Sequence, residues 1–221
     1  MKLNPGWELK VWTLKNISQL DLHEELYQRF KGLKSRFETL ALVDLVKVKL
    51  AAQYGGIVMD YDYVCVKPFD EIAYRYNYLV AVEPASIYAN IPITNTGFIA
   101  ATPGHEIANL ISNNFEKYYL DPEYKARIWK DMDNHAFEGP WEAIRGQSVV
   151  AYSILDYCNE KIETCDGVII LPAAYLECPF FSGIKLAAFR TRPLDLALAL
   201  VYKYTLNNGS LWWFKDNENV E

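Results

Sequence analysis

The 221-residue sequence lacks the patterns that would place it in several common functional classes. Its three histidines are scattered and its four cysteines show no CxxC spacing, so a zinc site built from either is not expected. No run of lysine and arginine occurs and the net charge is −6, which argues against a nucleic-acid partner. A phosphate-binding GxxxxGK loop is also missing.

Long apolar runs are missing as well. The two most apolar stretches, 171–189 and 193–206, are interrupted or too short to cross a bilayer, and no apolar core follows the first lysine as in a signal peptide. We therefore expect no transmembrane segment, and a cytoplasmic protein or a soluble fragment of a larger or membrane-associated one. With 51% hydrophobic residues, the chain is apolar enough for one sizeable core.

Helical and strand-like patterns alternate along the whole chain. Gly55 and Gly56 would end one of the helices as a C-cap. The alternation is typical of an α/β fold with a mixed, mainly parallel sheet flanked by helices, and we expect residues 1–221 to form a single domain. Strands are predicted at 7–14, 57–68, 78–84, 92–102 and 167–176, and helices at 16–34, 37–54, 105–119, 146–160 and 194–206.

Two carboxylates, Asp60 and Asp62, stand in the otherwise apolar strand that follows these glycines. Acidic residues seldom occupy a buried strand without a partner. At strand spacing both side chains point to one face, about 7 Å apart, and ligands bind at strand ends in open α/β sheets. Such a pair suits Mn²⁺ or Mg²⁺ beside a substrate phosphate. The alternative is two solvent-exposed aspartates on an edge strand, because Asp-x-Asp alone is a weak signal.

Residues 41–70 resemble the signature of a family of sugar transferases that contain an Asp-x-Asp motif. The family includes Golgi α-1,6-mannosyltransferases and galactosyltransferases and bacterial capsular-polysaccharide enzymes, and the glucosylating domain of large clostridial toxins is related. Its helix carries an aspartate and, three residues later, a basic residue that is most often arginine; a Gly-Gly turn and the Asp-x-Asp strand follow. These places are taken in order by Asp44, Lys47, Gly55, Gly56, Asp60 and Asp62.

Further similarities to this family follow in the right order along the rest of the chain. Residues 95–107 resemble a strand that carries Asn95 and leads into a Pro-Gly-His turn. Asn208-x-Ser210-x-Trp212 is similar to the toxin pattern whose Asn and Ser complete the metal site and whose Trp holds the donor's phosphate. The resemblance therefore implies a single GT-A-like nucleotide-sugar-binding domain, with 207–221 as a possible C-terminal lid.

The resemblance also implies a role for each matching side chain. Asp60 and Asp62 would be the catalytic pair: Asp62 would bind the metal directly, and Asp60 would contact the ribose or reach the metal through water. Asp44 would accept hydrogen bonds from ribose or sugar hydroxyls, and Lys47 would also bind the donor. The remaining donor-binding residues would be Asn95, Asn208, Ser210 and Trp212, with Ser210 also at the metal. Weaker candidates for gripping the sugar are Glu142 and Gln147.

Three functions are compatible with these residues. The first is a metal-dependent glycosyltransferase that transfers a sugar from a UDP-sugar, or a GDP-sugar, to a glycan, protein or lipid acceptor with retention of configuration. The acceptor site would be sought at residues 118–141. The second is a nucleotide- or glycan-binding module of the same fold with weakened turnover. The third is a Mg²⁺-dependent phosphoryl or nucleotidyl enzyme, which would usually need further carboxylates or a phosphate-binding lysine loop.

Overall fold

The computed structural model describes residues 2–32, 36–60, 63–65, 68–82, 94–133, 141–158, 165, 167–171 and 201–203. The helices are η1 (Leu14–Gln19, a 3₁₀ helix), α1 (Glu24–Lys31), α2 (Arg36–Tyr54), α3 (Asp70–Ala73), α5 (Glu106–Leu120), α6 (Pro122–Asp133) and α7 (Trp141–Tyr157). The strands are β1 (Gly56–Met59), β2 (Tyr63–Cys65), β3 (Tyr78–Val82), β4 (Thr94–Ala101), β5 (Val168–Leu171) and β6 (Val201–Lys203).

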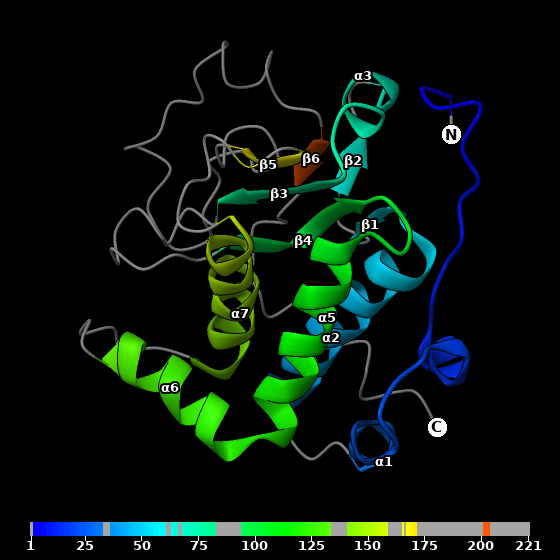
Figure 1. The fold of residues 1–221 in the computed structure, drawn as a ribbon. Helices are drawn as coiled ribbons and strands as arrows, with labels where there is room; N and C mark the ends of the chain where they lie inside the picture. Colours follow the sequence, from blue (N-terminus) through cyan, green and yellow to red (C-terminus); the bar gives the residue numbers. More distant parts are fainter. Residues whose placement is uncertain are drawn as a thin grey trace, which may run out of the picture.

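Four strands hydrogen-bond in the order β1-β4-β3-β5 to form the main sheet (Figure 1). β4 runs antiparallel to both of its neighbours, whereas β3 and β5 are parallel. β2 and β6 form a separate antiparallel pair. An α/β fold with a mixed sheet is thus confirmed, but a mainly parallel sheet is not, because two of the three pairings in this four-stranded sheet are antiparallel.

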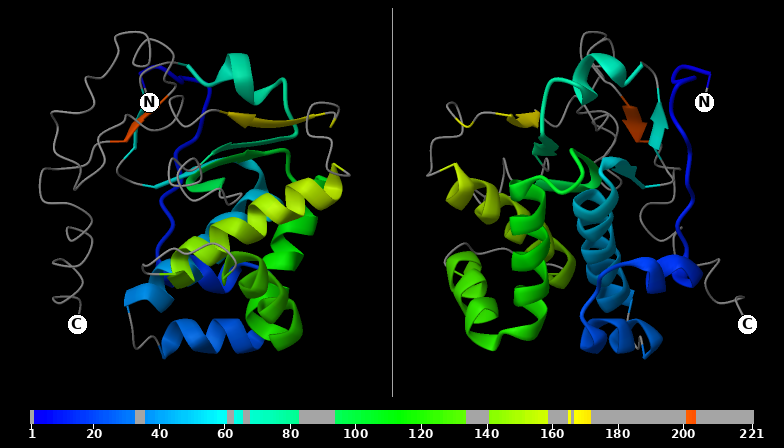
Figure 2. Two further views of the ribbon diagram at one scale, coloured as in Figure 1. Left: turned by 90° about the vertical axis from the view of Figure 1, so that its left-hand side faces the viewer. Right: turned by 45° about the vertical axis from the view of Figure 1, so that its right-hand side comes forward.

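Three helices, α2, α5 and α7, lie together on one face of this sheet (Figures 1 and 2). Side chains alternate between the two faces along each strand. Those that join the core shared with the helices are Tyr78, Val80, Ile99, Ala101 and Val168. Those that join a smaller apolar cluster on the opposite face, together with Tyr63 and Phe69, are Leu79, Ala81, Phe98, Ala100 and Leu171.

α2 forms where its apolar periodicity predicts it and ends at the two glycines. Gly55 and Gly56 have φ angles of 65° and 79°, in the left-handed region that favours glycine. A Cβ on Gly55 would also lie 2.4 Å from Cδ of Pro103, in the turn before α5. The helix therefore passes directly into β1, which places the second half of α2 beneath the end of that strand.

Two polar contacts to Glu116 connect α5 with α2 and with the start of α1. Nζ of Lys49 lies 2.9 Å from Oε1 of Glu116 on α5. The same oxygen accepts a hydrogen bond at 3.2 Å from the backbone N–H of His23, the N-cap of α1. Glu116 thus joins three helices at one atom.

The N-terminal segment differs from its prediction as a strand. Residues 8–13 are extended but pair with no strand among the described residues, and they run along the side of the molecule from the region of α3 toward α1 (Figure 1). The indole N–H of Trp7 donates to Asp70 at 2.6 Å, and the ring of Trp12 lies 5.3 Å from that of Tyr54. Trp7 and Trp12 are thus anchored on neighbouring elements, whereas Leu9 and Val11 between them are 64% and 72% exposed, so the alternation in the sequence marks no buried face here.

Other boundaries also differ from the sequence prediction. The strand expected at 57–68 is split, because the N–H of Tyr63 donates back to the carbonyl of Asp60 and turns the chain. α6 occupies much of the segment in which an acceptor site was expected, and α7 begins five residues earlier than predicted, at Trp141 instead of Gly146. Residues 201–203 of the last predicted helix form β6, and the rest of that helix lies outside the described residues.

A disulfide bond joins Cys158, directly after α7, to Cys165, ahead of β5. The sequence left these two cysteines unassigned. In the part of the chain that the structure describes, no helix has the length and apolar character needed to cross a bilayer.

Candidate functional site

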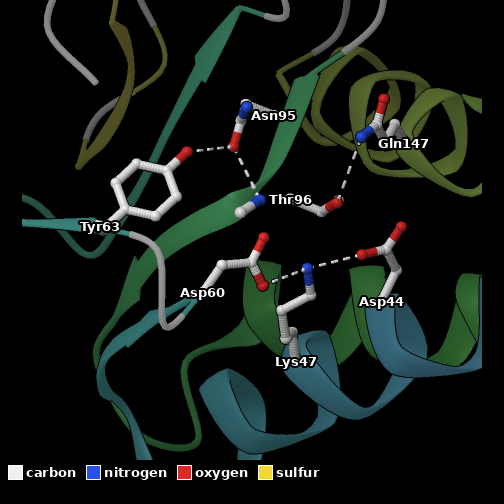
Figure 3. Close-up of polar contacts among 8 residues, drawn as sticks. Asp44, Lys47, Asp60, Tyr63, Asn95, Thr96 and Gln147 are labelled. Carbon is white, nitrogen blue, oxygen red and sulfur yellow. Dashed lines mark hydrogen bonds and ion pairs between the residues drawn. The ribbon is translucent and has the colours of Figure 1, made fainter. Parts of the chain in front are cut away.

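The candidate site is centred on a lysine held between two carboxylates (Figure 3). Lys47 and Asp44 face the same side of α2, one turn apart, and Nζ lies 2.7 Å from Oδ1 of Asp44. Asp60 follows β1, and its Oδ1 accepts a hydrogen bond from the same Nζ at 3.0 Å. One ammonium group therefore links the helix before the glycine turn to the end of the strand after it.

The charges in this cluster are almost fully removed from solvent. Asp44 is 6% exposed and Lys47 is 8% exposed. Burial raises the pKa of Asp44 above its ordinary value, although Lys47 and a hydrogen bond from the Thr96 hydroxyl oppose this shift. Burial alone would lower the pKa of Lys47, but Asp44 and Asp60 together outweigh it and raise the pKa above 10.5. Lys47 thus stays protonated at neutral pH.

A second group of polar atoms lies on the β4 side of Asp60. Oδ1 of Asn95 accepts a hydrogen bond from the Tyr63 hydroxyl at 3.2 Å and one from the Gly97 N–H at 2.7 Å. The carbonyl of Gly97 accepts a hydrogen bond at 2.8 Å from the N–H of Asp60. These contacts bring the start of β4, the start of β2 and the end of β1 to one place.

α7 closes the side of the site next to α2. Nε2 of Gln147 lies 3.5 Å from Oγ1 of Thr96, a long contact, and the carbonyl of Gln147 accepts a hydrogen bond from Thr94 at 3.2 Å. Because Thr96 also hydrogen-bonds Asp44, it connects the strand, α2 and α7. Helix packing on the sheet therefore supports the carboxylates from two sides.

Several residues singled out in the sequence meet at this site. Asp44, Lys47, Asp60 and Asn95 come from α2, from the end of β1 and from β4, and Gln147 reaches the same region from α7 (Figure 3). Glu142 lies in the first turn of α7. The remaining candidates lie outside the described residues: Asp62, Asn208, Ser210 and Trp212, together with the possible lid at 207–221.

Tyr63, Thr96 and Gly97 were not singled out by sequence reasoning. They connect residues that are 30 or more positions apart in the chain, as in the Tyr63–Asn95 and Gln147–Thr96 contacts. The only available signal was position: Thr96 and Gly97 directly follow Asn95 in a predicted strand, and Tyr63 directly follows the second aspartate.

The described residues supply part of what a hard divalent cation requires. Oδ1 of Asp60 is occupied by Lys47, whereas Oδ2 is directed toward Gly97, 2.9 Å from where a Cβ would stand. Among the described residues, no group of three or more His, Cys, Asp or Glu side chains is arranged to hold a metal. A carboxylate oxygen is the donor type that Mg²⁺ and Mn²⁺ use, so the site fits such an ion if Asp62 and a substrate diphosphate add theirs.

Part of the chain that carries these residues is similar to a known family. Residues 1–79 match the model of the family described as "Glycosyltransferase sugar-binding region containing DXD motif". The match ends in β3 and covers η1, α1, α2 and the Asp60 region, so it includes Asp44 and Lys47. No curated protein sequence matched the chain. The family match supports a glycosyltransferase-type function, and hence a sugar donor and an acceptor.

Proposed function

We propose that this protein is a metal-dependent glycosyltransferase that moves a sugar from a nucleoside-diphosphate sugar to a glycan, protein or lipid acceptor with retention of configuration. UDP-sugars are the favoured donors, and GDP-sugars are the second class to test. The observation that carries the proposal is the Asp44–Lys47–Asp60 cluster, in which one ammonium joins the helix and the strand of the matched DXD region at 2.7 and 3.0 Å.

The metal in this proposal is Mn²⁺ or Mg²⁺, held by Asp60 and Asp62 with Ser210 as a further ligand. When bound, it would offset the negative charge that develops on the leaving nucleoside diphosphate. Asp60 is suited to this place because its backbone is pinned to β4 and its side chain to Lys47, so little reorganisation is needed.

The chain's own residues bind and orient the donor around this centre. Lys47 keeps Asp60 in place and adds a fixed positive charge close to the diphosphate. Asp44 holds Lys47 through Oδ1 and, in the proposal, accepts a hydrogen bond from a ribose or sugar hydroxyl. Asn95, Asn208 and Trp212 complete donor binding, with 207–221 excluding water as a lid.

Donor hydrolysis and transfer provide the test. The protein is incubated with Mn²⁺ and a panel of UDP- and GDP-sugars, and release of the nucleoside diphosphate is measured. We expect slow release from one donor, lost on addition of EDTA and restored by Mn²⁺. Asp60→Asn should lower the rate by about 100-fold or more, because a neutral amide is a poor ligand for a hard cation. Asp156→Asn, at an exposed position of α7, is the matched control.

Each outcome has a defined meaning. Metal-dependent release that Asp60→Asn abolishes and Asp156→Asn leaves intact supports the proposal. Tight binding of a sugar nucleotide without release from any donor would instead support a binding module of the same fold. Full activity of a folded Asp60→Asn variant, judged by its circular dichroism, would refute the assignment of the site.

A further inference from the structure

β4 changes face at Gly97. Thr96 contacts Gln147 of α7, on the helix-covered face of the sheet, whereas Phe98, two residues later, belongs to the apolar cluster on the opposite face. In a regular strand these two side chains would share a face. The β3–β4 register is also irregular here, because it shifts between the pairs Leu79–Ala100 and Ala81–Asn95. A bulge of this kind redirects side chains, and glycine is a common residue at such places.

Three oxygen atoms converge on the space where a side chain of Gly97 would stand. A Cβ built there would lie 2.9 Å from each of Oδ2 of Asp60, Oδ1 of Asn95 and the hydroxyl oxygen of Tyr63. Carbon and oxygen atoms in ordinary van der Waals contact stand farther apart, at about 3.4 Å or more. Only a residue without a side chain leaves these three oxygens where they are.

The backbone of Gly97 holds two of the same three residues. Its carbonyl accepts from the N–H of Asp60 at 2.8 Å, and its N–H donates to Asn95 at 2.7 Å. Asp60 is therefore positioned by Gly97 in two ways: a backbone hydrogen bond fixes its main chain, and the missing Cβ makes room for its carboxylate.

We propose that Gly97 is a positioning residue of the candidate site, which seats Asp60 so that Oδ1 meets Lys47 while Oδ2 stays available on the β4 side. The part of this inference that concerns the donor and the metal rests on the proposed glycosyltransferase function. The part that concerns the Lys47–Asp60 contact does not.

The chemistry of the close contacts predicts how a side chain at this position would act. All three atoms that a Cβ would meet are at the ends of side chains, which move more easily than backbone. Gly97→Ala should therefore fold and displace the Asp60 carboxylate. By contrast, a Cβ at Gly55 would meet the backbone of Pro103, so Gly55→Ala would act on the fold itself.

The test is a double-mutant cycle on folding stability. The coupling between Lys47 and Asp60 is measured by urea denaturation of the unchanged chain, Lys47→Met, Asp60→Asn and the double variant, first with Gly97 and then with Ala at that position. We expect the coupling to fall by at least half in the Gly97→Ala background. Gly6→Ala, an exposed position with no atom within 4 Å of its Cβ, should leave it unchanged.

Calorimetric titration of UDP in the presence of Mn²⁺ gives the second readout. We expect Gly97→Ala to weaken binding about tenfold and Gly6→Ala to leave it intact. Tyr63→Phe combined with Gly97→Ala removes one of the three close atoms and should restore part of the coupling. If Gly97→Ala lowers the coupling, but even the unchanged chain binds neither UDP nor GDP in the presence of Mn²⁺, the result would support the positioning role and overturn the proposed function.

The remaining outcomes overturn the inference. Coupling that is equal in both backgrounds would mean that Gly97 does not position Asp60, whatever happens to UDP binding. Failure of both Gly97→Ala and the combined Tyr63→Phe variant to fold would show that the glycine serves the strand and not the site.

Discussion

Lys47 determines the charge balance of the candidate site. It contacts Asp44 and Asp60 from a nearly dry position, where a lone carboxylate would be strongly disfavoured. Arginine would place a planar fork between the same two groups, whereas lysine provides a point charge that can approach both. The two residues also differ in titration, because only lysine loses its proton in the accessible alkaline range.

Stability at high pH offers a direct test of this charge balance. The pKa of Lys47 is raised above its unfolded value of 10.5, so its contribution to stability is complete below 10.5 and is lost as the pH rises through the folded pKa. Between the two values the free energy of unfolding should fall by about 1.4 kcal/mol per pH unit. Lys47→Arg should not show this decline.

Urea denaturation between pH 9 and about 11.5 measures the effect. Burial also raises the pKa of Tyr78, which adds to the alkaline loss, so both lysine and arginine forms are compared in a Tyr78→Phe background. Parallel stability curves for the two forms would contradict the deep burial of a protonated Lys47 between Asp44 and Asp60.

At the scale of secondary-structure elements, α2 connects the site to the rest of the fold. One side of this helix carries Asp44 and Lys47, and Lys49 reaches Glu116 of α5. Glu116 also accepts a hydrogen bond from the backbone N–H of His23, the N-cap of α1. Movement of α2 along its axis would break the Lys47–Asp60 and Lys49–Glu116 contacts together, so packing against α5 should stabilise the site's geometry.

Glu116→Gln tests this connection. The amide can still accept from His23 but leaves the ammonium of Lys49, 8% exposed, without its carboxylate partner. We expect the free energy of unfolding to fall by about 1–3 kcal/mol, less than for a fully buried pair because Glu116 is partly exposed. Chemical denaturation provides the measurement.

Lys117→Gln is the matched control for that substitution. Lys117 sits on the same helix but pairs with Asp121 at 3.9 Å in an exposed position, and such pairs contribute about 0–1 kcal/mol. If the two substitutions had equal effects, the Lys49–Glu116 pair would be no more important than a surface pair.

Local sequence patterns were enough to predict the elements that carry the site. The periodicity of α2, the two glycines after it and the spacing of Asp44 and Lys47 are all local, and the structure places Asp60 beside them. Long-range pairing is not encoded in such patterns. The segment at 7–14 alternates like a strand, yet its Leu9 and Val11 are exposed and residues 8–13 pair with no described strand. The bulge at Gly97 likewise depends on which strands flank β4.

The features that the sequence prediction missed also depend on contacts that its patterns do not describe. α6 was overlooked because half of its twelve residues are charged, whereas its N-terminus is fixed by Asp121, whose carboxylate accepts from the N–H groups of Glu123 and Tyr124. Thr96 and Tyr63 belong to the site only through partners distant in sequence. The predicted roles of Asp62 and of 207–221 lie outside the described residues and stay predictions.

At the scale of the whole molecule, the Cys158–Cys165 disulfide joins the two layers of the fold. α7 belongs to the helical layer that supports Gln147, and β5 belongs to the sheet, as the parallel partner of β3. Disulfides of this kind form and persist in oxidising compartments. The Cys158–Cys165 bond would therefore form more readily if the protein folds in an oxidising compartment.

Reduction of this bond should destabilise the protein without abolishing its fold. Closing the loop between residues 158 and 165 restricts the unfolded chain, and a loop of this length contributes about 2–3 kcal/mol in the chain-entropy model. We expect the midpoint of urea denaturation to fall on addition of a phosphine reductant. The Cys158→Ser, Cys165→Ser double variant should have the midpoint of the reduced protein, and the reductant should not change it. Cys65 of β2, which is not part of a disulfide bond, provides the control, because Cys65→Ser should keep the full response. Mass spectrometry after alkylation without reductant checks the pairing directly. If residues 158 and 165 are both alkylated in protein folded under oxidising conditions, or if the reductant leaves the midpoint unchanged, the disulfide does not join the two layers in solution.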